Sequence, residues 1–132
     1  MAKLPARLAT DSRALRIMVV EDDVINATLL AEVLEDMGYI VCAIEATETD
    51  AVAAAARCVP DLIVMDATLG DGSGIAAIKT ILRSRAIPHL FVSGDLSEVV
   101  ALCPSAPMLR KPFRISDLAL AIERAVTTPA LA

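Results

Sequence analysis

The sequence predicts an α/β fold in which a five-stranded parallel sheet carries helices on both of its faces. Short apolar runs alternate five times with segments of helical periodicity, which is typical of parallel strands joined by crossover helices. The chain has 132 residues, a length that suits one compact domain with one core. Hydrophobic residues make up 56% of it and charged residues 22%, and this composition excludes intrinsic disorder.

The first strand is expected at residues 16–20, a short β-branched run that stops abruptly at acidic residues. Four apolar side chains then recur at every fourth position: Ile25, Leu29, Val33 and Met37. This spacing predicts an amphipathic helix over residues 24–37. Asp22 or Asp23 is a suitable N-cap for the helix, and Gly38 lies where a C-terminal glycine is expected.

Four further strands have the same pattern of short apolar runs. They are expected at residues 39–44, 62–65, 89–92 and 108–110. Polar or glycine residues follow the last three of them. These following residues are Asp66, then Ser93 and Gly94, then Lys111 and Pro112.

Four more helices are expected between and after these strands. They cover residues 50–57, 75–85 and 96–102, and the last one begins at a cap on Ser116. Thr47 is placed to cap the helix at 50–57, and Pro60 terminates it. A glycine-rich loop at residues 70–74 leads into the helix at 75–85.

The candidate site follows from the expected sheet, because parallel strands bring their carboxyl ends to one edge and ligands gather there. The residues expected at that edge are Glu21, Asp22, Asp23, Asp66, Ser93 and Lys111. Crowded carboxylates repel one another unless a cation neutralises them, and oxygen ligands suit Mg²⁺. A carboxylate is also a nucleophile that can take a phosphoryl group, whose charge Mg²⁺ and Lys111 would offset. We therefore expect phosphoryl chemistry on Asp66.

At these spacings the sequence resembles the receiver domain of two-component response regulators, the CheY-like fold. The matching pieces are residues 19–22, Asp66 with Gly74 eight residues later, Ser93 with Gly94, and residues 111–113. The resemblance implies a doubly wound, flavodoxin-like sheet with the strand order 2-1-3-4-5. We expect three segments: a flexible N-terminal leader at 1–14, the receiver domain at 15–127 and a C-terminal tail at 128–132.

The resemblance also implies roles for individual residues. Asp66 would be the phospho-acceptor, and the Mg²⁺ ligands would be Glu21, Asp22, Asp66 and the backbone carbonyl of Thr68. Ser93 would be the switch hydroxyl. Lys111 would contact the phosphoryl oxygens, and its peptide bond to Pro112 would be cis.

The sequence departs from the receiver pattern in two places. Receivers usually carry a Tyr or Phe two or three positions before the lysine, and here Met108 and Leu109 stand there. The segment between Ser93 and Lys111 is also about one helical turn shorter than usual. We therefore expect a short or irregular fourth helix.

The function implied by the resemblance is that of a single-domain response regulator rather than an enzyme. It would accept a phosphoryl group from a sensor histidine kinase or a histidine phosphotransfer protein and signal by protein–protein contact, as a monomer or weak dimer. At most it would phosphorylate itself from small donors and dephosphorylate itself. One alternative is a receiver-like adaptor whose output does not depend on phosphorylation, which the missing aromatic residue favours. Another is a small Mg²⁺-dependent phosphatase, which Thr68 disfavours because such enzymes need an acidic residue there.

Charge, hydropathy and cysteine spacing exclude other classes. The 12 Lys and Arg and 17 Asp and Glu residues give a net charge of −5, without the basic patch of a nucleic-acid-binding protein. Apolar runs are far shorter than the roughly 20 residues that span a bilayer. With no secretory signal and no Cys-x-x-Cys pair, Cys42, Cys58 and Cys103 are expected to be buried free thiols of a cytoplasmic protein.

Each candidate residue taken singly also has a purely structural interpretation. Asp22 and Asp23 are common helix caps, Ser93 before a glycine is common in turns, and Lys111 is typical of solvated surface. His89 is expected at the start of a strand, away from the acidic residues, and without a catalytic role. The combination of these groups at successive strand ends favours an acidic metal site.

Overall fold

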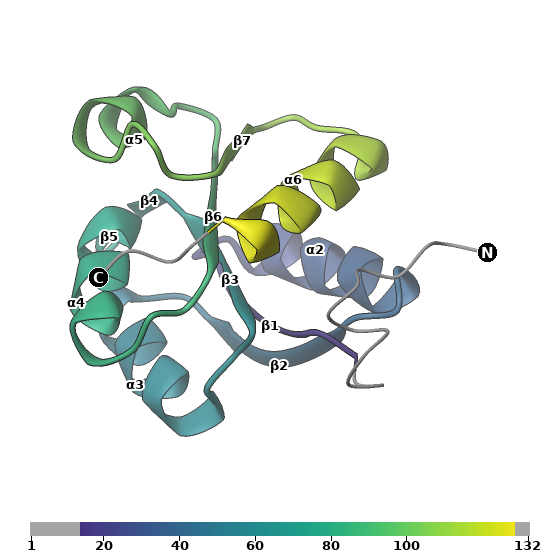
Figure 1. Cartoon of the computed structure of the whole chain (residues 1–132), viewed down its shortest axis with the longest axis horizontal. Helices are drawn as coiled ribbons and strands as arrows, with labels where there is room; N and C mark the ends of the chain where they lie inside the picture. The colour runs from purple at the N-terminus through teal and green to yellow at the C-terminus, as the bar shows by residue number, and fades with distance from the viewer. Residues whose placement is uncertain (1–13, 129–132) are drawn as a thin grey trace.

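A computed structural model describes residues 14–128 of the chain. Five parallel strands form one sheet: β1 (Arg16–Val20), β2 (Ile40–Glu45), β3 (Leu62–Asp66), β6 (His89–Ser93) and β7 (Met108–Arg110). Their order is β2-β1-β3-β6-β7, which confirms the expected order 2-1-3-4-5 (Figure 1). The expected leader and tail lie outside the described residues, apart from one residue at each end.

Five helices cover the two faces of the sheet. They are α2 (Val24–Asp36), α3 (Glu48–Cys58), α4 (Gly74–Ser84), α5 (Ser97–Leu102) and α6 (Ile115–Thr127). α2 and α6 lie on one face, and α3, α4 and α5 lie on the other (Figure 1). With six residues, α5 is the short fourth helix that the sequence predicts.

The apolar interior consists of two clusters rather than the single core expected, because the sheet separates them. Side chains of β1 alternate between the two: Ile17 and Val19 pack with α2 and α6, while Met18 and Val20 pack with α3 and α4. β3, in the middle of the sheet, is buried along its whole length, as a run covered on both faces must be. This burial fixes the central strands that lead to the site.

Two of the expected helix caps are confirmed. The Asp23 carboxylate accepts a hydrogen bond from the Asn26 N–H at 3.0 Å, so Asp23 rather than Asp22 caps α2. The Thr47 hydroxyl accepts from the Asp50 N–H at 3.1 Å and caps α3. Asp22 is thereby left for another role.

The cap predicted at Ser116 is wrong. α6 begins at Ile115, its N-cap is Arg114, and Ser116 lies inside the first turn. The carboxylate of Asp117 accepts from the Arg114 N–H at 3.2 Å. The first turn is therefore closed by a carboxylate inside the helix, and the Ser116 hydroxyl is not needed at its start.

The glycine-rich loop contains a small hairpin that the sequence analysis did not predict. β4 (Thr68–Leu69) pairs in the antiparallel sense with β5 (Gly72–Ser73), and Thr68 lies opposite Ser73. The hairpin directly follows Asp66 and leads into α4. It is therefore part of the wall of the site.

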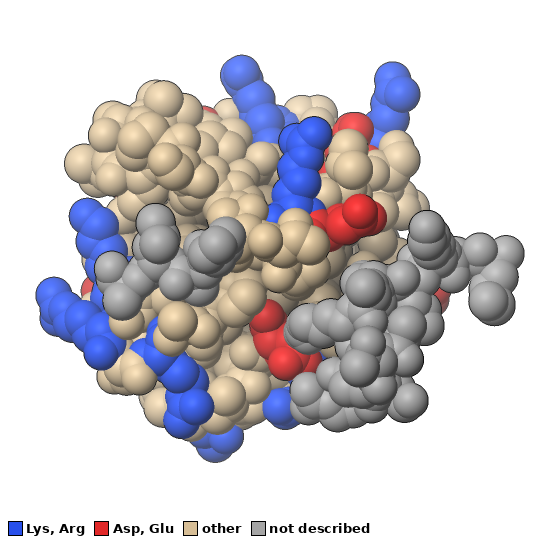
Figure 2. Space-filling view, viewed as in Figure 1, with Lys and Arg blue, Asp and Glu red and all other residues tan. Residues whose placement is uncertain are grey.

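The surface and the cysteines add three observations. Figure 2 shows Lys and Arg side chains standing mostly at the periphery of one face. The longest described helices, α2 and α6, have 13 residues each, and none of the helices within 14–128 is long and apolar enough to cross a membrane. Cys42, Cys58 and Cys103 are free, but they are half-buried rather than buried, because they lie on the edge strand β2 and at the ends of α3 and α5.

The carboxyl end of α3 has an unusual backbone conformation. Val59, which follows the helix, has a φ of 45°, in the left-handed region that disfavours β-branched residues. The Arg16 guanidinium donates to the carbonyl oxygen of Cys58 at 2.7 Å and to that of Val59 at 3.4 Å. The end of α3 is thus tied to β1 by a charged donor, at the cost of strain in Val59.

Replacing Val59 by glycine should relieve this strain and raise the free energy of unfolding by about 1 kcal/mol. Urea denaturation monitored by circular dichroism measures the change. Val59→Ala is the control, because alanine keeps most of the left-handed penalty and should gain less. An alanine variant as stable as the glycine variant would show that backbone strain is not the cause.

Candidate functional site

The polar residues expected at the carboxyl edge of the sheet lie there, except that the Asp23 side chain caps α2 and does not join the acidic cluster. Glu21 directly follows β1, Asp66 and Ser93 are the last residues of β3 and β6, and Lys111 directly follows β7. Glu21, Asp66 and Ser93 are the buried polar residues of the described chain, with 6%, 8% and 4% of their surface exposed. Buried polar side chains of this kind need partners, and the site supplies them for Glu21 and Asp66.

Three carboxylates form the acidic part of the site. One oxygen each of Glu21, Asp22 and Asp66 lies within 4.8 Å of the others. Asp22 is exposed, whereas the other two residues are buried. Three converging carboxylate oxygens with one side open to water fit Mg²⁺, which binds a few carboxylates and keeps several waters.

Lys111 lies between two of these carboxylates. Its Nζ donates to Glu21 Oε1 at 2.5 Å and to Asp66 Oδ2 at 3.3 Å. Burial by itself would lower the pKa of Lys111, but the hydrogen bond to Glu21 and the charge of Asp66 raise that pKa above its ordinary value. At Glu21 burial raises the pKa, and the hydrogen bond from Lys111 opposes this rise. The ammonium therefore stays charged and offsets part of the acidic charge.

Backbone N–H groups hold the carboxylates in place. The Gly70 N–H donates to Asp22 Oδ2 at 2.6 Å, and this bond lowers the pKa of Asp22. The Thr68 N–H donates to Asp66 Oδ1 at 3.0 Å. The Asp23 N–H donates to Glu21 Oε2 at 3.1 Å. Each carboxylate is thus oriented by at least one backbone donor before any cation binds.

Ser93 is close to Asp66 across the sheet, and Thr68 is close to it along the chain. Asp66 is paired with Val92 in the register of β3 and β6, so Ser93 lies one residue further along the neighbouring strand. The Ser93 carbonyl accepts from the Lys111 N–H at 2.9 Å, which joins the two strand ends. Thr68 contacts Asp66 through its N–H, and the role of its carbonyl as a metal ligand stays a prediction.

Three other expectations concern residues around the site. The Lys111–Pro112 peptide bond is cis, as the resemblance implies. Met108 is half-buried and packs against the cluster on the α3 and α4 face, opposite Phe91 in the register of β6 and β7. His89 begins β6, at the end of that strand away from Ser93, and burial lowers its pKa.

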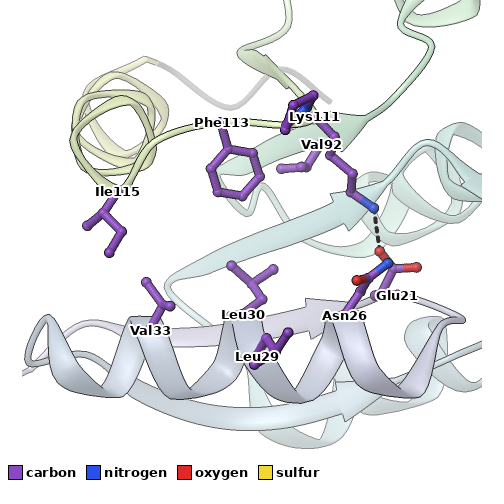
Figure 3. Close-up of a pocket in the computed structure, with 10 residues that line it drawn as sticks. Glu21, Asn26, Leu29, Leu30, Val33, Val92, Lys111, Phe113 and Ile115 are labelled. Carbon is purple, nitrogen blue, oxygen red and sulfur yellow. Dashed lines mark hydrogen bonds and ion pairs between the residues drawn. The ribbon is translucent and has the colours of Figure 1, made fainter.

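An apolar groove next to the site was not predicted. It has a volume of about 650 Å³ and runs between α2 and the start of α6. Its lining is mainly apolar, with Glu21, Asn26 and Lys111 at one end and Leu29, Leu30, Val33, Val92, Pro112, Phe113 and Ile115 along it. Figure 3 shows Phe113, Leu30 and Val92 converging in the groove, beside the bond between Lys111 and Glu21.

The apolar repeat of α2 is the sequence signal that could have indicated this groove. From the sequence it predicts only the apolar face of an amphipathic helix. Ile25 and Leu29 belong to that repeat, yet they are 70% and 55% exposed. The helix instead buries Ala27, Ala31 and Leu34 against the sheet. The start of α2 therefore presents apolar side chains to solvent directly after the acidic residues.

The comparison with protein families gives one match. The family model of the response regulator receiver domain matches residues 17–123. That range includes every residue of the site described above. The resemblance stated from the sequence is thus confirmed.

Two curated relatives are named as regulators. The transcriptional regulatory protein PdtaR of Mycobacterium tuberculosis is 34% identical over 116 residues, which are 85% of this chain and 57% of that protein. The phyllosphere-induced regulator PhyR of Methylorubrum extorquens is 29% identical over 128 residues, 94% of this chain and 46% of that protein. The chain therefore spans about half the length of these relatives.

Solved structures agree with the fold. The receiver domain of the response regulator PhyR from Erythrobacter litoralis superposes with a TM-score of 0.81 at 25% identity, covering 92% of this chain and 97% of that one. PhyR from Brucella abortus gives a TM-score of 0.76 at 27% identity, covering 91% of this chain and 53% of that one. With its five-stranded sheet and its converging acidic residues, the chain belongs to the family of response regulator receiver domains.

Proposed function

We propose that the chain accepts a phosphoryl group on Asp66, with Mg²⁺ bound by Glu21, Asp22 and Asp66, and signals by protein–protein contact. The observation that carries this proposal is the position of Lys111, whose Nζ lies 3.3 Å from Asp66 Oδ2 beside two further carboxylates. The family membership supports it, because receiver domains act with histidine kinases or phosphotransfer proteins. Signalling by protein–protein contact, as the output of the whole protein, is likewise proposed.

The reaction is a displacement at phosphorus. A carboxylate oxygen of Asp66 forms the new P–O bond while the bond from phosphorus to the donor breaks, and its electron pair leaves with the donor. Bound Mg²⁺ would neutralise charge on the phosphoryl oxygens. In the resting protein three carboxylates outnumber one ammonium, so negative charge remains that favours a divalent cation.

Lys111 and Ser93 act after the group arrives. Glu21, Asp22 and Asp66 would hold the cation, and a cation beside Glu21 would free the Lys111 ammonium from its short bond to that carboxylate, so that it could donate to a phosphoryl oxygen. The Ser93 hydroxyl donates to another oxygen and draws the loop after β6 inward. Because this loop leads into the short helix α5, the new charge changes the surface around α5.

The groove between α2 and α6 is the surface that we propose for contact with the phosphoryl donor. It opens beside Lys111, and its rim carries the exposed side chains of Leu29 and Ile115, which are 55% and 60% exposed. A donor protein that approaches Asp66 from the side of Lys111 would cross this rim. An apolar helix face on the donor would cover these side chains on binding.

A receiver-like adaptor remains the second candidate. The half-buried Met108, in place of an aromatic residue, favours it. An adaptor that does not use phosphorylation has no need of Mg²⁺ or of phosphoryl uptake. The two measurements described next therefore separate the candidates.

Asp66→Asn should abolish phosphoryl uptake, because the amide is not a nucleophile for this step. Intact-protein mass spectrometry after incubation with acetyl phosphate and Mg²⁺ should show one added phosphoryl group on the parent chain and none on the variant. Asp71→Asn is the matched control, since Asp71 is exposed in the hairpin turn and should leave the addition unchanged. An addition that persists on Asp66→Asn would remove this residue from the proposed role.

Asp22→Ala should weaken Mg²⁺ binding by about tenfold or more, because it deletes one of three oxygen ligands. Isothermal titration calorimetry measures the affinity. Asp23→Ala controls for the loss of a neighbouring acidic group, because the Asp23 carboxylate caps α2 instead of joining the cluster. Equal Mg²⁺ affinity in Asp22→Ala and the parent would contradict the assignment.

Lys111→Ala should lower the free energy of unfolding by about 2 kcal/mol in EDTA, because two buried carboxylates lose their shared ammonium. Addition of Mg²⁺ should recover most of this loss, since the cation replaces the missing positive charge. Urea titrations with and without Mg²⁺ test both effects. Lys79→Ala, an exposed change of the same charge, should show neither effect, and a loss that Mg²⁺ does not reduce would contradict the idea.

A further inference from the structure

The three glycines of the loop at 70–74 each lie against a different acidic residue. A Cβ atom at Gly70 would lie 2.8 Å from Asp22 Oδ2, and one at Gly72 would lie 2.7 Å from Glu48 Oε1. At Gly74 a Cβ would lie 1.9 Å from the backbone oxygen of Asp66, which no rearrangement of side chains could accommodate. The loop thus follows these residues more closely than any residue with a side chain would permit.

Two carboxylates from separate elements hold the hairpin through its backbone. Asp22, in the loop between β1 and α2, accepts from the Gly70 N–H at 2.6 Å. Glu48, the first residue of α3, accepts from the Ser73 N–H at 3.0 Å. One anchor lies at the turn and the other on β5, so together they fix the position of the hairpin on the molecule.

Glu48 is separate from the acidic cluster of the site. The carboxylates that converge there are those of Glu21, Asp22 and Asp66. Glu48 is linked to the cluster through the hairpin. It accepts from the Ser73 N–H on one side of the turn, and the Gly70 N–H at the turn donates to Asp22. Its contact with β5 is close, because Gly72, with a φ of +128°, places no side chain between them.

We propose that Glu48 is a positioning residue for the metal site, which acts by holding the β4–β5 hairpin so that the Gly70 N–H orients Asp22. The inference rests on the proposed function, in which Asp22 binds Mg²⁺. A hairpin with two residues in each strand has too few hydrogen bonds to hold its own position, so an external anchor decides where its turn lies. The Gly70 N–H holds Oδ2 of Asp22, and one oxygen of Asp22 lies within 4.8 Å of those of Glu21 and Asp66.

Without Glu48 the Ser73 N–H would turn to water and the turn would lose its fixed place. Asp22 would then lose the hydrogen bond from Gly70 and gain rotational freedom, because its side chain is exposed. Groups that orient a metal ligand without touching the metal are worth about 10- to 100-fold in metal affinity. We expect Glu48→Ala to weaken Mg²⁺ binding by about tenfold, at the low end of that range, since Asp22 itself remains.

The test compares three variants of the full chain: Glu48→Ala, Glu48→Gln and Asp50→Ala. Glutamine keeps a side-chain oxygen that accepts from the Ser73 N–H, so it should rescue Mg²⁺ affinity to within about twofold of the parent. Asp50 lies in the same first turn of α3 and is exposed, so Asp50→Ala removes the same charge without touching the hairpin. Calorimetry with MgCl₂ gives the affinities, and hydrogen exchange of the Gly70 and Ser73 amides reports the hairpin.

Glu48→Ala should show weaker Mg²⁺ binding together with faster exchange at both amides, while the other two variants resemble the parent. The proposal is overturned if Glu48→Ala binds Mg²⁺ like the parent, or if Asp50→Ala loses as much affinity, which would make the effect one of charge alone. It is also overturned if Glu48→Gln loses as much as Glu48→Ala. If the parent chain binds no Mg²⁺, the proposed function fails. The Gly70 amide then still shows whether Glu48 holds the hairpin: unchanged exchange in Glu48→Ala overturns that part as well.

Discussion

Carboxylate crowding at one edge of the sheet is the constraint on which the arrangement of the site depends. A parallel sheet brings the ends of β1 and β3 together, and with them Glu21 and Asp66, both buried. Two buried carboxylates at this separation are unfavourable unless positive charge is supplied. Lys111 supplies this charge. It follows β7, which lies beyond β6 in the sheet, and its ammonium donates to both carboxylates. The three carboxylates still outnumber this one ammonium, and the remaining negative charge is of the kind that a divalent cation neutralises.

The hairpin after Asp66 restrains an exposed carboxylate, that of Asp22. Asp22 is exposed and would have several rotamers if nothing restrained it. The Gly70 N–H restrains one of its oxygens, and the hairpin carrying that N–H is itself held by Glu48. Glycines make both contacts possible, since any Cβ at Gly70 or Gly72 would meet a carboxylate. The glycine content of this loop is therefore explained by close approach as much as by turn geometry.

The two sides of the site differ in how fully their apolar side chains are covered. On the side of α2 and α6, an apolar groove opens next to Lys111, with Leu29 and Ile115 exposed at its rim. On the other side, α3 and α4 pack tightly through alanines and isoleucines, and α5 is reduced to six residues. Met108, half-buried against this second cluster, connects the end of the sheet with the short helix region. A phosphorylation signal that leaves the site toward α5 would pass through this side.

The sequence by itself determined the five strands and the convergence of Glu21, Asp66 and Lys111, because apolar periodicity is local and the ends of parallel strands must meet. The strand order followed from the resemblance to receiver domains and was not contained in the periodicity. Only the tertiary structure decided which neighbouring groups satisfy each polar side chain. In the structure Asp22 accepts a hydrogen bond from the Gly70 N–H, and Asp23 caps α2. In addition, α6 begins before Ser116, and part of the apolar repeat of α2 is exposed to solvent. The glycine-rich loop forms a hairpin. These features depend on contacts between segments far apart in the chain, and the local pattern of residues does not contain that information.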